Sequence, residues 1–270
     1  MRKRLFGLLA TTAIVFAACQ GAATPSPTTG ATPPPATPVI TPTPPNEVEL
    51  FNSEYASKVE AGTDGGTLII GDWQEATQFN PFYLGQVTEA NVASAVWASL
   101  IVAAHDYKYL PDLAADIPTT DNGGVKVPGD GGDAMTITWK LRDGLKWSDG
   151  APLTCDDFKY AWEWVLDPEN VGVITQGYED ITAFDCPSPT EIVQHWKAIY
   201  SSYLTFQVAP LPRHFLSKIA VADQVAGAGM RPDEIVSLPV SGAFKFQRVT
   251  PGQDLRLERN TNYTSAISGK

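Results

Sequence analysis

Short runs in which apolar and polar residues alternate are the clearest pattern in the chain, and they are typical of strands with one buried face. The runs are 136–141, 192–197, 243–249 and 253–258. In the first of them, Ile137, Trp139 and Leu141 fall on one face, because side chains alternate along a strand. The last two runs flank Pro251-Gly252, which predicts a turn between paired strands.

Two further runs are expected to be strands for different reasons. The run 67–71 is apolar throughout its middle and follows two glycines, which predicts a buried strand. The run 145–147 follows the turn signal Asp143-Gly144 and is expected to pair back on 136–141 as a hairpin.

Helical spacing of apolar residues predicts three helices. The first spans 89–102, with Thr88 as its N-cap. The second begins after Thr154, whose hydroxyl suits a helix start, and ends before Pro168. The third spans 212–222. Strands and helices interleave without a regular βαβ order, which favours a mixed α/β fold with antiparallel hairpins.

The start of the chain has the features of a secretory signal peptide. Three positive charges within 1–4 precede the apolar run 5–16, and two alanines precede Cys19. A cysteine directly after small residues is the pattern of bacterial lipoproteins, in which the thiol is acylated. We therefore expect 1–19 to be a lipoprotein signal peptide with Cys19 as the lipidation site. The alternative is an ordinary secretory signal with an incidental cysteine.

Residues 20–47 are expected to form a tether. The stretch 20–45 consists almost entirely of Ala, Thr, Pro, Gly and Ser and carries no charge. Such a segment cannot bury enough apolar surface to offset its ordering entropy. Its prolines favour an extended conformation of about 3.1 Å per residue, so it could hold a domain up to roughly 80 Å from a membrane.

The charge of the chain limits its partners. The formal net charge is −11, and removing the three positive charges within 1–4 changes it from −11 to −14. An acidic protein lacks the basic footprint of nucleic-acid binding, and it does not spread on an anionic membrane surface. No second apolar run of the sequence approaches the length of a membrane span, so attachment to a membrane is expected through Cys19 alone.

Two other cysteines, Cys155 and Cys186, form an even pair in a chain expected outside the cytoplasm. Such a pair predicts a disulfide, and two buried free thiols are the alternative.

A set of short motifs follows in order along most of 65–263. The motifs are Gly66-Thr67-Leu68-Ile69-Ile70-Gly71, Phe79-Asn80-Pro81, Tyr109-Leu110-Pro111-Asp112-Leu113-Ala114, TWKLRDGLKWSDGAPLT at 138–154, Asp156-Asp157-Phe158, Leu211-Pro212-Arg213-His214-Phe215-Leu216, Gly242-Ala243-Phe244-Lys245-Phe246, Pro251-Gly252-Gln253 and Leu257-Glu258-Arg259-Asn260. Together they resemble the family 5 solute-binding proteins of ABC transporters, the dipeptide/oligopeptide-binding type. The chain departs from the family at Val240-Ser241-Gly242-Ala243, where the family usually reads Gly-Thr-Gly-Pro.

The resemblance implies an α/β fold of the periplasmic-binding-protein type, class II with three domains and a mixed sheet. Domain I is expected from 48–88 together with 236–270, and the smaller inserted domain II from 89–235. The family fold continues well beyond this length, so we expect an N-terminal portion in which domain III is missing. In the family, the ligand lies between domains I and III, so half of the cleft would be absent.

The expected ligand-binding residues fall in two groups. Trp73, Gln74 and Glu75 follow the first predicted strand, at the end where ligands commonly meet α/β sheets. The second group corresponds to a loop through which family members present backbone groups to a peptide. It comprises Leu84, Gly85, Gln86, Val87 and Glu89. Peptide capture also needs an acid for a ligand amine, which Glu75 or Glu89 is expected to supply.

The function implied by the resemblance is that of an extracytoplasmic solute-binding lipoprotein of an ABC importer. Such a protein is monomeric and lipid-anchored on the extracellular or periplasmic face. It delivers peptides or related solutes to a permease and its ATPase, without enzymatic activity, cofactor or metal. The alternatives are a sensory or adhesive surface protein on the same scaffold and, in a different class, a surface hydrolase.

The sequence carries no H-E-x-x-H, G-x-S-x-G, phosphate loop or C-x-x-C motif, which argues against the hydrolase. His195 is expected to be structural within its strand, and His214 to lie at a helix start. Asp121, Asp130 and Asp133 lack the spacing of an EF-hand and are expected in a solvated loop. The tryptophans expected in the core are Trp139, Trp147, Trp162 and Trp164.

Overall fold

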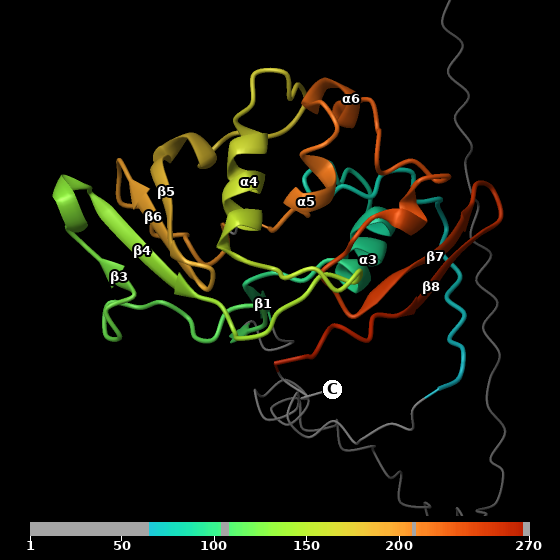
Figure 1. Cartoon of the computed structure of the whole chain (residues 1–270), viewed down its shortest axis with the longest axis horizontal. Helices are drawn as coiled ribbons and strands as arrows, with labels where there is room; N and C mark the ends of the chain where they lie inside the picture. The colour runs from blue at the N-terminus through green and yellow to red at the C-terminus, as the bar shows by residue number, and fades with distance from the viewer. Residues whose placement is uncertain (1–64, 104–107, 207–208, 267–270) are drawn as a thin grey trace, which may run out of the picture. The chain divides into compact units, whose positions relative to one another are not determined.

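The structure is a computed structural model that describes residues 65–103, 108–206 and 209–266 (Figure 1). The predicted signal peptide with Cys19 and the predicted tether lie outside these residues. The α-helices are α3 (Val87–Val96), α4 (Cys155–Val165), α5 (Arg213–Leu216) and α6 (Val221–Val225). The strands are β1 (Ile101–Ala103), β2 (Tyr109–Pro111), β3 (Val125–Lys126), β4 (Met135–Lys140), β5 (Ile181–Ser188), β6 (Glu191–Trp196), β7 (Phe244–Thr250) and β8 (Asp254–Arg259). Short 3-10 helices lie at Asp130–Gly132, Tyr178–Asp180 and Ile235–Ser237. Within the described ranges, no helix is long and apolar enough to cross a bilayer.

A four-stranded antiparallel sheet with the order β3-β4-β6-β5 forms one side of the fold (Figure 1). The strands predicted at 136–141 and 192–197 are confirmed as β4 and β6. Ile137 pairs with Gln194 across them, and Trp139 pairs with Ile192. All four of these side chains are almost fully buried, so the alternation in the sequence identified the buried face correctly.

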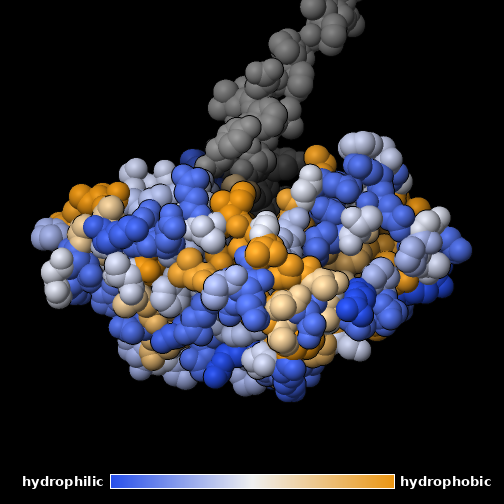
Figure 2. Space-filling model, turned by 90° about the horizontal axis from the view of Figure 1, so that it is seen from above, coloured by the Kyte–Doolittle hydropathy of each residue, from blue (hydrophilic) through white to orange (hydrophobic). Residues whose placement is uncertain are grey.

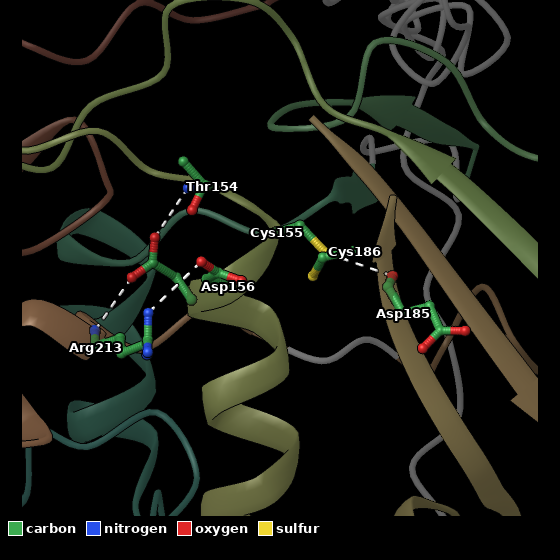
Figure 3. Close-up of a disulfide and its surroundings, with 7 residues drawn as sticks. Thr154, Cys155, Asp156, Asp185, Cys186 and Arg213 are labelled. Atoms are coloured by element: carbon green, nitrogen blue, oxygen red, sulfur yellow. Dashed lines mark hydrogen bonds and ion pairs between the residues drawn. A yellow bond between two sulfur atoms is a disulfide. The ribbon is translucent and has the colours of Figure 1, made fainter. Parts of the chain in front are cut away.

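Helix α4 packs against β5 and α5 (Figure 1). It begins as predicted, because Thr154 is its N-cap and a carboxylate oxygen of Asp157 accepts the Thr154 N–H at 2.9 Å. The first helical residue, Cys155, forms a disulfide with Cys186 of β5, with the two Cα atoms 5.7 Å apart (Figure 3). The start of α4 is therefore fixed to the sheet by a covalent bond as well as by packing.

Helix α3 packs against β7, which pairs with β8 in a separate two-stranded sheet, the predicted hairpin (Figure 1). The helix was expected to span 89–102 with Thr88 as its N-cap, but it begins at Val87 after the N-cap Gln86 and ends at Val96. The Gly242 N–H donates to the Val96 carbonyl at 2.8 Å, and the Ala98 N–H donates to the Ser241 hydroxyl at 2.9 Å. These two hydrogen bonds hold the residues after the helix in an extended conformation that continues to β1.

Three other predictions about local structure are wrong. The run 67–71 is not a strand, and Leu68, Ile69 and Ile70 are 82%, 88% and 78% exposed. A strand needs a hydrogen-bonded neighbour, and none of the described strands pairs with this run. Figure 2 shows that apolar side chains also gather across the middle of one face of the molecule.

The predicted hairpin between 145–147 and 136–141 does not form, because β3 and β6 occupy both edges of β4. The run 145–147 bonds instead to 151–153, through Trp147 to Ala151 and Leu153 to Leu145.

The helix predicted at 212–222 is divided into α5 and α6. The side-chain amide of Gln224 donates to the carbonyls of Leu216 and Ile219, at 3.0 and 2.8 Å, and so satisfies backbone groups at the break.

Candidate functional site

The two groups of predicted ligand-binding residues lie on segments that both contact the first half of α3. The side chain of Asn91 in α3 donates to Asp72 at 3.3 Å, which brings the segment 72–75 to the helix. Glu89 of α3 accepts hydrogen bonds from Thr77, two residues after Glu75, and from Gly85 in the loop before the helix. The segment that follows the first group and the loop of the second group therefore meet at Glu89. Contact of the two groups with a ligand stays a prediction, and on that prediction we call the residues 73–75 and 84–87 the ligand wall.

Several members of the ligand wall are accessible. Trp73 is 78% exposed and Val87 is 62% exposed, and Gly85 is exposed as well. Leu84 and Gln86 are partly buried. An exposed backbone at a glycine next to an exposed apolar side chain suits contact with an extended peptide.

Glu75 is exposed, and its Oε1 accepts the N–H of Gly252 at 2.7 Å. Gly252 lies in the turn between β7 and β8 with a φ of 73°, a conformation that favours glycine. Glu75 therefore connects the ligand wall to this hairpin while its side chain stays at the surface.

Glu89 has a different environment from the one expected. It is only 3% exposed, and its carboxylate accepts five hydrogen bonds from two short segments of the same loop. Burial alone would raise the pKa of Glu89, but hydrogen bonds from Gly85, Thr77 and Gln86 bring it below its usual value. Because these donors occupy the carboxylate, Glu75 is the more accessible of the two acids for a ligand amine.

The loop between these segments is ordered by its own side chains. The Gln78 amide oxygen accepts the N–H groups of Phe79 and Asn80 at 2.8 and 2.9 Å, and the Asn80 side chain accepts the Phe82 N–H at 2.9 Å. The indole N–H of Trp97 donates to the Phe79 carbonyl at 2.9 Å. The Phe79-Asn80-Pro81 motif therefore builds the loop that leads to the ligand wall.

Aromatic contacts that no local sequence pattern indicated attach this loop to α4. The rings of Phe82 and Tyr83 lie 5.6 and 5.5 Å from the ring of Trp164. The Tyr83 hydroxyl also donates to the side-chain oxygen of Asn170, just after α4. These contacts attach the loop that leads to the ligand wall to Trp164 of α4 and to Asn170.

A pocket of about 490 Å³ lies at the start of α4, and its lining includes none of the ligand wall. Two basic side chains of its lining, Arg213 and His214, lie close to carboxylates. His214 lies 2.8 Å from Asp149. Arg213 lies 3.5 Å from Asp156, as Figure 3 shows. Burial raises the pKa of Asp157 beneath them, although the Thr154 N–H opposes the shift. The pocket shares no residue with the ligand wall, and Lys218 adds a further basic side chain to its lining.

Two acidic residues of the predicted solvated loop contact basic side chains. Asp130 lies 2.6 Å from Lys126, and Asp133 lies 2.6 Å from Nδ1 of His195 in β6. Nε2 of His195 contacts Asp185 at 3.3 Å. In the part of the chain that the structure describes, no three His, Cys, Asp or Glu side chains are grouped as metal ligands.

Residues 108–269 match the family model of bacterial extracellular solute-binding proteins, family 5 Middle. The oligopeptide-binding protein AppA of Bacillus subtilis is 26% identical over 218 residues, which cover 78% of this chain and 37% of that protein. The periplasmic oligopeptide-binding protein OppA of Salmonella typhimurium is 23% identical over 232 residues, 77% of this chain and 39% of that protein. The chain thus spans less than two fifths of these relatives.

Among solved structures, the ABC transporter substrate-binding protein CtaP of Listeria monocytogenes is similar with a TM-score of 0.58. The two proteins are 25% identical, and the match covers 74% of this chain and 38% of that one. The fold is therefore that of periplasmic binding proteins, as the sequence motifs predicted.

Proposed function

The chain belongs to the bacterial extracellular solute-binding proteins of family 5, and from this membership we propose that it captures peptides for an ABC importer. It acts by binding and carries out no chemistry on its ligand. Ligand binding would shift an open–closed equilibrium, because a ligand favours the state that it contacts best. The permease with its ATPase would then recognise the closed form.

The structural observation that carries this proposal is the segment 84–87, which leads into α3 and is exposed at Gly85 and Val87. Its exposed surface includes Gly85 and the apolar side chain of Val87, and the segment is fixed by hydrogen bonds from the Gly85 and Gln86 N–H groups to Glu89. Backbone groups and apolar surface are what an extended peptide needs for recognition. The names of AppA and OppA as oligopeptide-binding proteins support a peptide as the ligand class.

The experiment uses the complete gene product, purified without denaturation. Mass spectrometry should detect copurified peptides, and titration with a mixed peptide pool should saturate after they are removed. Val87→Asp should weaken binding at least tenfold, about 1.4 kcal/mol, because it places a charge on the apolar contact. The control is Val171→Asp at another exposed valine, 68% exposed and outside the ligand wall. Equal affinities of the two variants would remove Val87 from the site.

We also propose that Cys19 is acylated and that 20–47 holds the binding domain near its permease. Cys19→Ser should move the protein from the detergent phase to the aqueous phase in Triton X-114 partitioning. Labelled fatty acid should be incorporated into the wild type and not into the variant. Loss of peptide uptake in a strain lacking the permease would distinguish a transport receptor from a sensory or adhesive protein.

A further inference from the structure

Both ends of the loop 77–86 are held by one carboxylate. Oε1 of Glu89 accepts the Thr77 hydroxyl at 3.0 Å, the Thr77 N–H at 3.4 Å and the Gln78 N–H at 3.1 Å. Oε2 accepts the N–H groups of Gly85 and Gln86 at 2.9 and 3.2 Å. Two segments that are about eight residues apart in sequence therefore meet at a single side chain.

A carboxylate is suited to this position. Its two oxygens have four lone-pair directions, and hydrogen bonds to an ionised acceptor are stronger than neutral ones. Glu89 is the third residue of α3, where the helix macrodipole favours a negative charge. A neutral side chain of the same size would replace one acceptor oxygen by an N–H donor that faces other donors.

We propose that Glu89 is a positioning residue for the ligand wall: it holds the loop 77–86 in the shape that presents Gly85 and Val87 to the ligand. This inference rests on the proposed function. Because the N–H groups of Gly85 and Gln86 bond to Glu89, the ligand makes its hydrogen bonds to other groups of the wall. Preorganising a contact segment in this way raises affinity, because less ordering accompanies binding.

The test begins without ligand, by hydrogen–deuterium exchange of the complete gene product. In Glu89→Gln, amides at 77, 78, 85 and 86 should exchange at least about tenfold faster than in the wild type. Glu89→Asp keeps the charge, but its side chain is shorter and reaches only one end of the loop. The amides at that end should stay protected, and those at the other end should exchange faster. Glu163→Gln is the matched control, because Glu163 is an exposed residue on α4.

The second measurement is affinity for the mixed peptide pool, under conditions where circular dichroism shows each variant to be fully folded. Glu89→Gln should bind at least about tenfold more weakly than Glu163→Gln. Thr77→Val removes only the hydroxyl donor and should give a smaller loss in both measurements. The Thr77 variant also keeps the inference testable if Glu89→Gln does not fold.

Unchanged amide protection in Glu89→Gln would overturn the inference whatever the ligand. Faster exchange with unchanged peptide affinity would also overturn the inference, because the order of the loop would then have no effect on peptide affinity. If the wild type binds no peptide, the proposed function fails, and the exchange result alone decides whether Glu89 holds the loop.

Discussion

The hydroxyl of Tyr263 donates a hydrogen bond to Oδ1 of Asp112 at 2.8 Å, across 151 positions of the sequence. Asp112 is buried, and the guanidinium of Arg142 donates to its carbonyl and, at 2.8 Å, to the carbonyl of Thr264. The segment after β8 is thereby joined to the region after β2. This polar cluster connects parts of the chain that the sequence motifs placed in two different domains.

Removing the hydroxyl should destabilise the protein measurably. Tyr263→Phe leaves the buried carboxylate of Asp112 without one donor, and a hydrogen bond to a charged group contributes about 1.5–3 kcal/mol. Tyr203→Phe is the matched control, because the Tyr203 hydroxyl donates to a neutral acceptor, the Pro118 carbonyl, at 2.9 Å. Its loss should cost about 0.5–1.5 kcal/mol. Urea denaturation of both variants checks the order, and equal costs would contradict it.

Asp112 should also make the free energy of unfolding depend on pH in an unusual direction. Burial raises its pKa above the ordinary 3.8, although Tyr263 and Arg142 oppose the shift. A raised pKa in the folded state gives stability that is present below pH 3.8 and is lost as the pH rises through the folded value. The stability advantage of the wild type over Asp112→Asn should therefore shrink as the pH rises from about 3.5 to 7. Urea denaturation across this range checks it, and an advantage that grows with pH would contradict the assignment.

The regular part of the fold could be predicted from the sequence because its signals are local. Alternation gave the buried faces of β4 and β6, and the residues at the start of α4 gave its N-cap. The run 67–71 has an equally strong apolar pattern but is exposed, because burial depends on a neighbouring strand. The predicted hairpin at 145–147 does not form for a related reason, because β3 and β6 pair with both edges of β4.

The ligand-binding role of the candidate site stays a prediction. The structure shows that Gly85 and Val87 are exposed, while the N–H groups of Gly85 and Gln86 bond to Glu89. The environment of Glu89 could not be foreseen, because its donors at Thr77 and Gln78 are 12 and 11 positions earlier and no local pattern links them. The contact of Tyr83 with Trp164 depends likewise on tertiary packing.

The disulfide between Cys155 and Cys186 should contribute substantially to stability. It closes a loop with a sequence separation of 31. The chain-entropy model gives about 3–4 kcal/mol for a loop of this size, mainly by restricting the unfolded chain. Replacing both cysteines by alanine should lower the free energy of unfolding by about this amount in urea. Reductant should lower the wild type to a similar value and leave the double variant unchanged, and a reductant effect on the double variant would point to another cause.

Gly242 should not tolerate a side chain. A Cβ there would lie 2.6 Å from the carbonyl carbon of Val96, which is backbone and cannot move aside as a flexible side chain would. Gly242→Ala should therefore cost about 1–3 kcal/mol and loosen the junction between α3 and β7. Gly71→Ala is the control, because no atom of the described residues lies within 4 Å of its added Cβ. Thermal unfolding of both variants checks the prediction, and similar midpoints would contradict the close approach.

Glu89 should give the opposite pH dependence to Asp112. Its pKa lies below the ordinary 4.5, because burial is outweighed by hydrogen bonds from Gly85, Thr77 and Gln86. A lowered pKa in the folded state gives stability that is fully present above pH 4.5 and is lost as the pH falls through the folded value. The wild type should be more stable than Glu89→Gln at about pH 7, and this difference should shrink below pH 4.5. Urea denaturation of Glu163→Gln under the same conditions separates a general charge effect from this one. A difference that stays constant on acidification would show that the carboxylate is not ionised when it holds the loop.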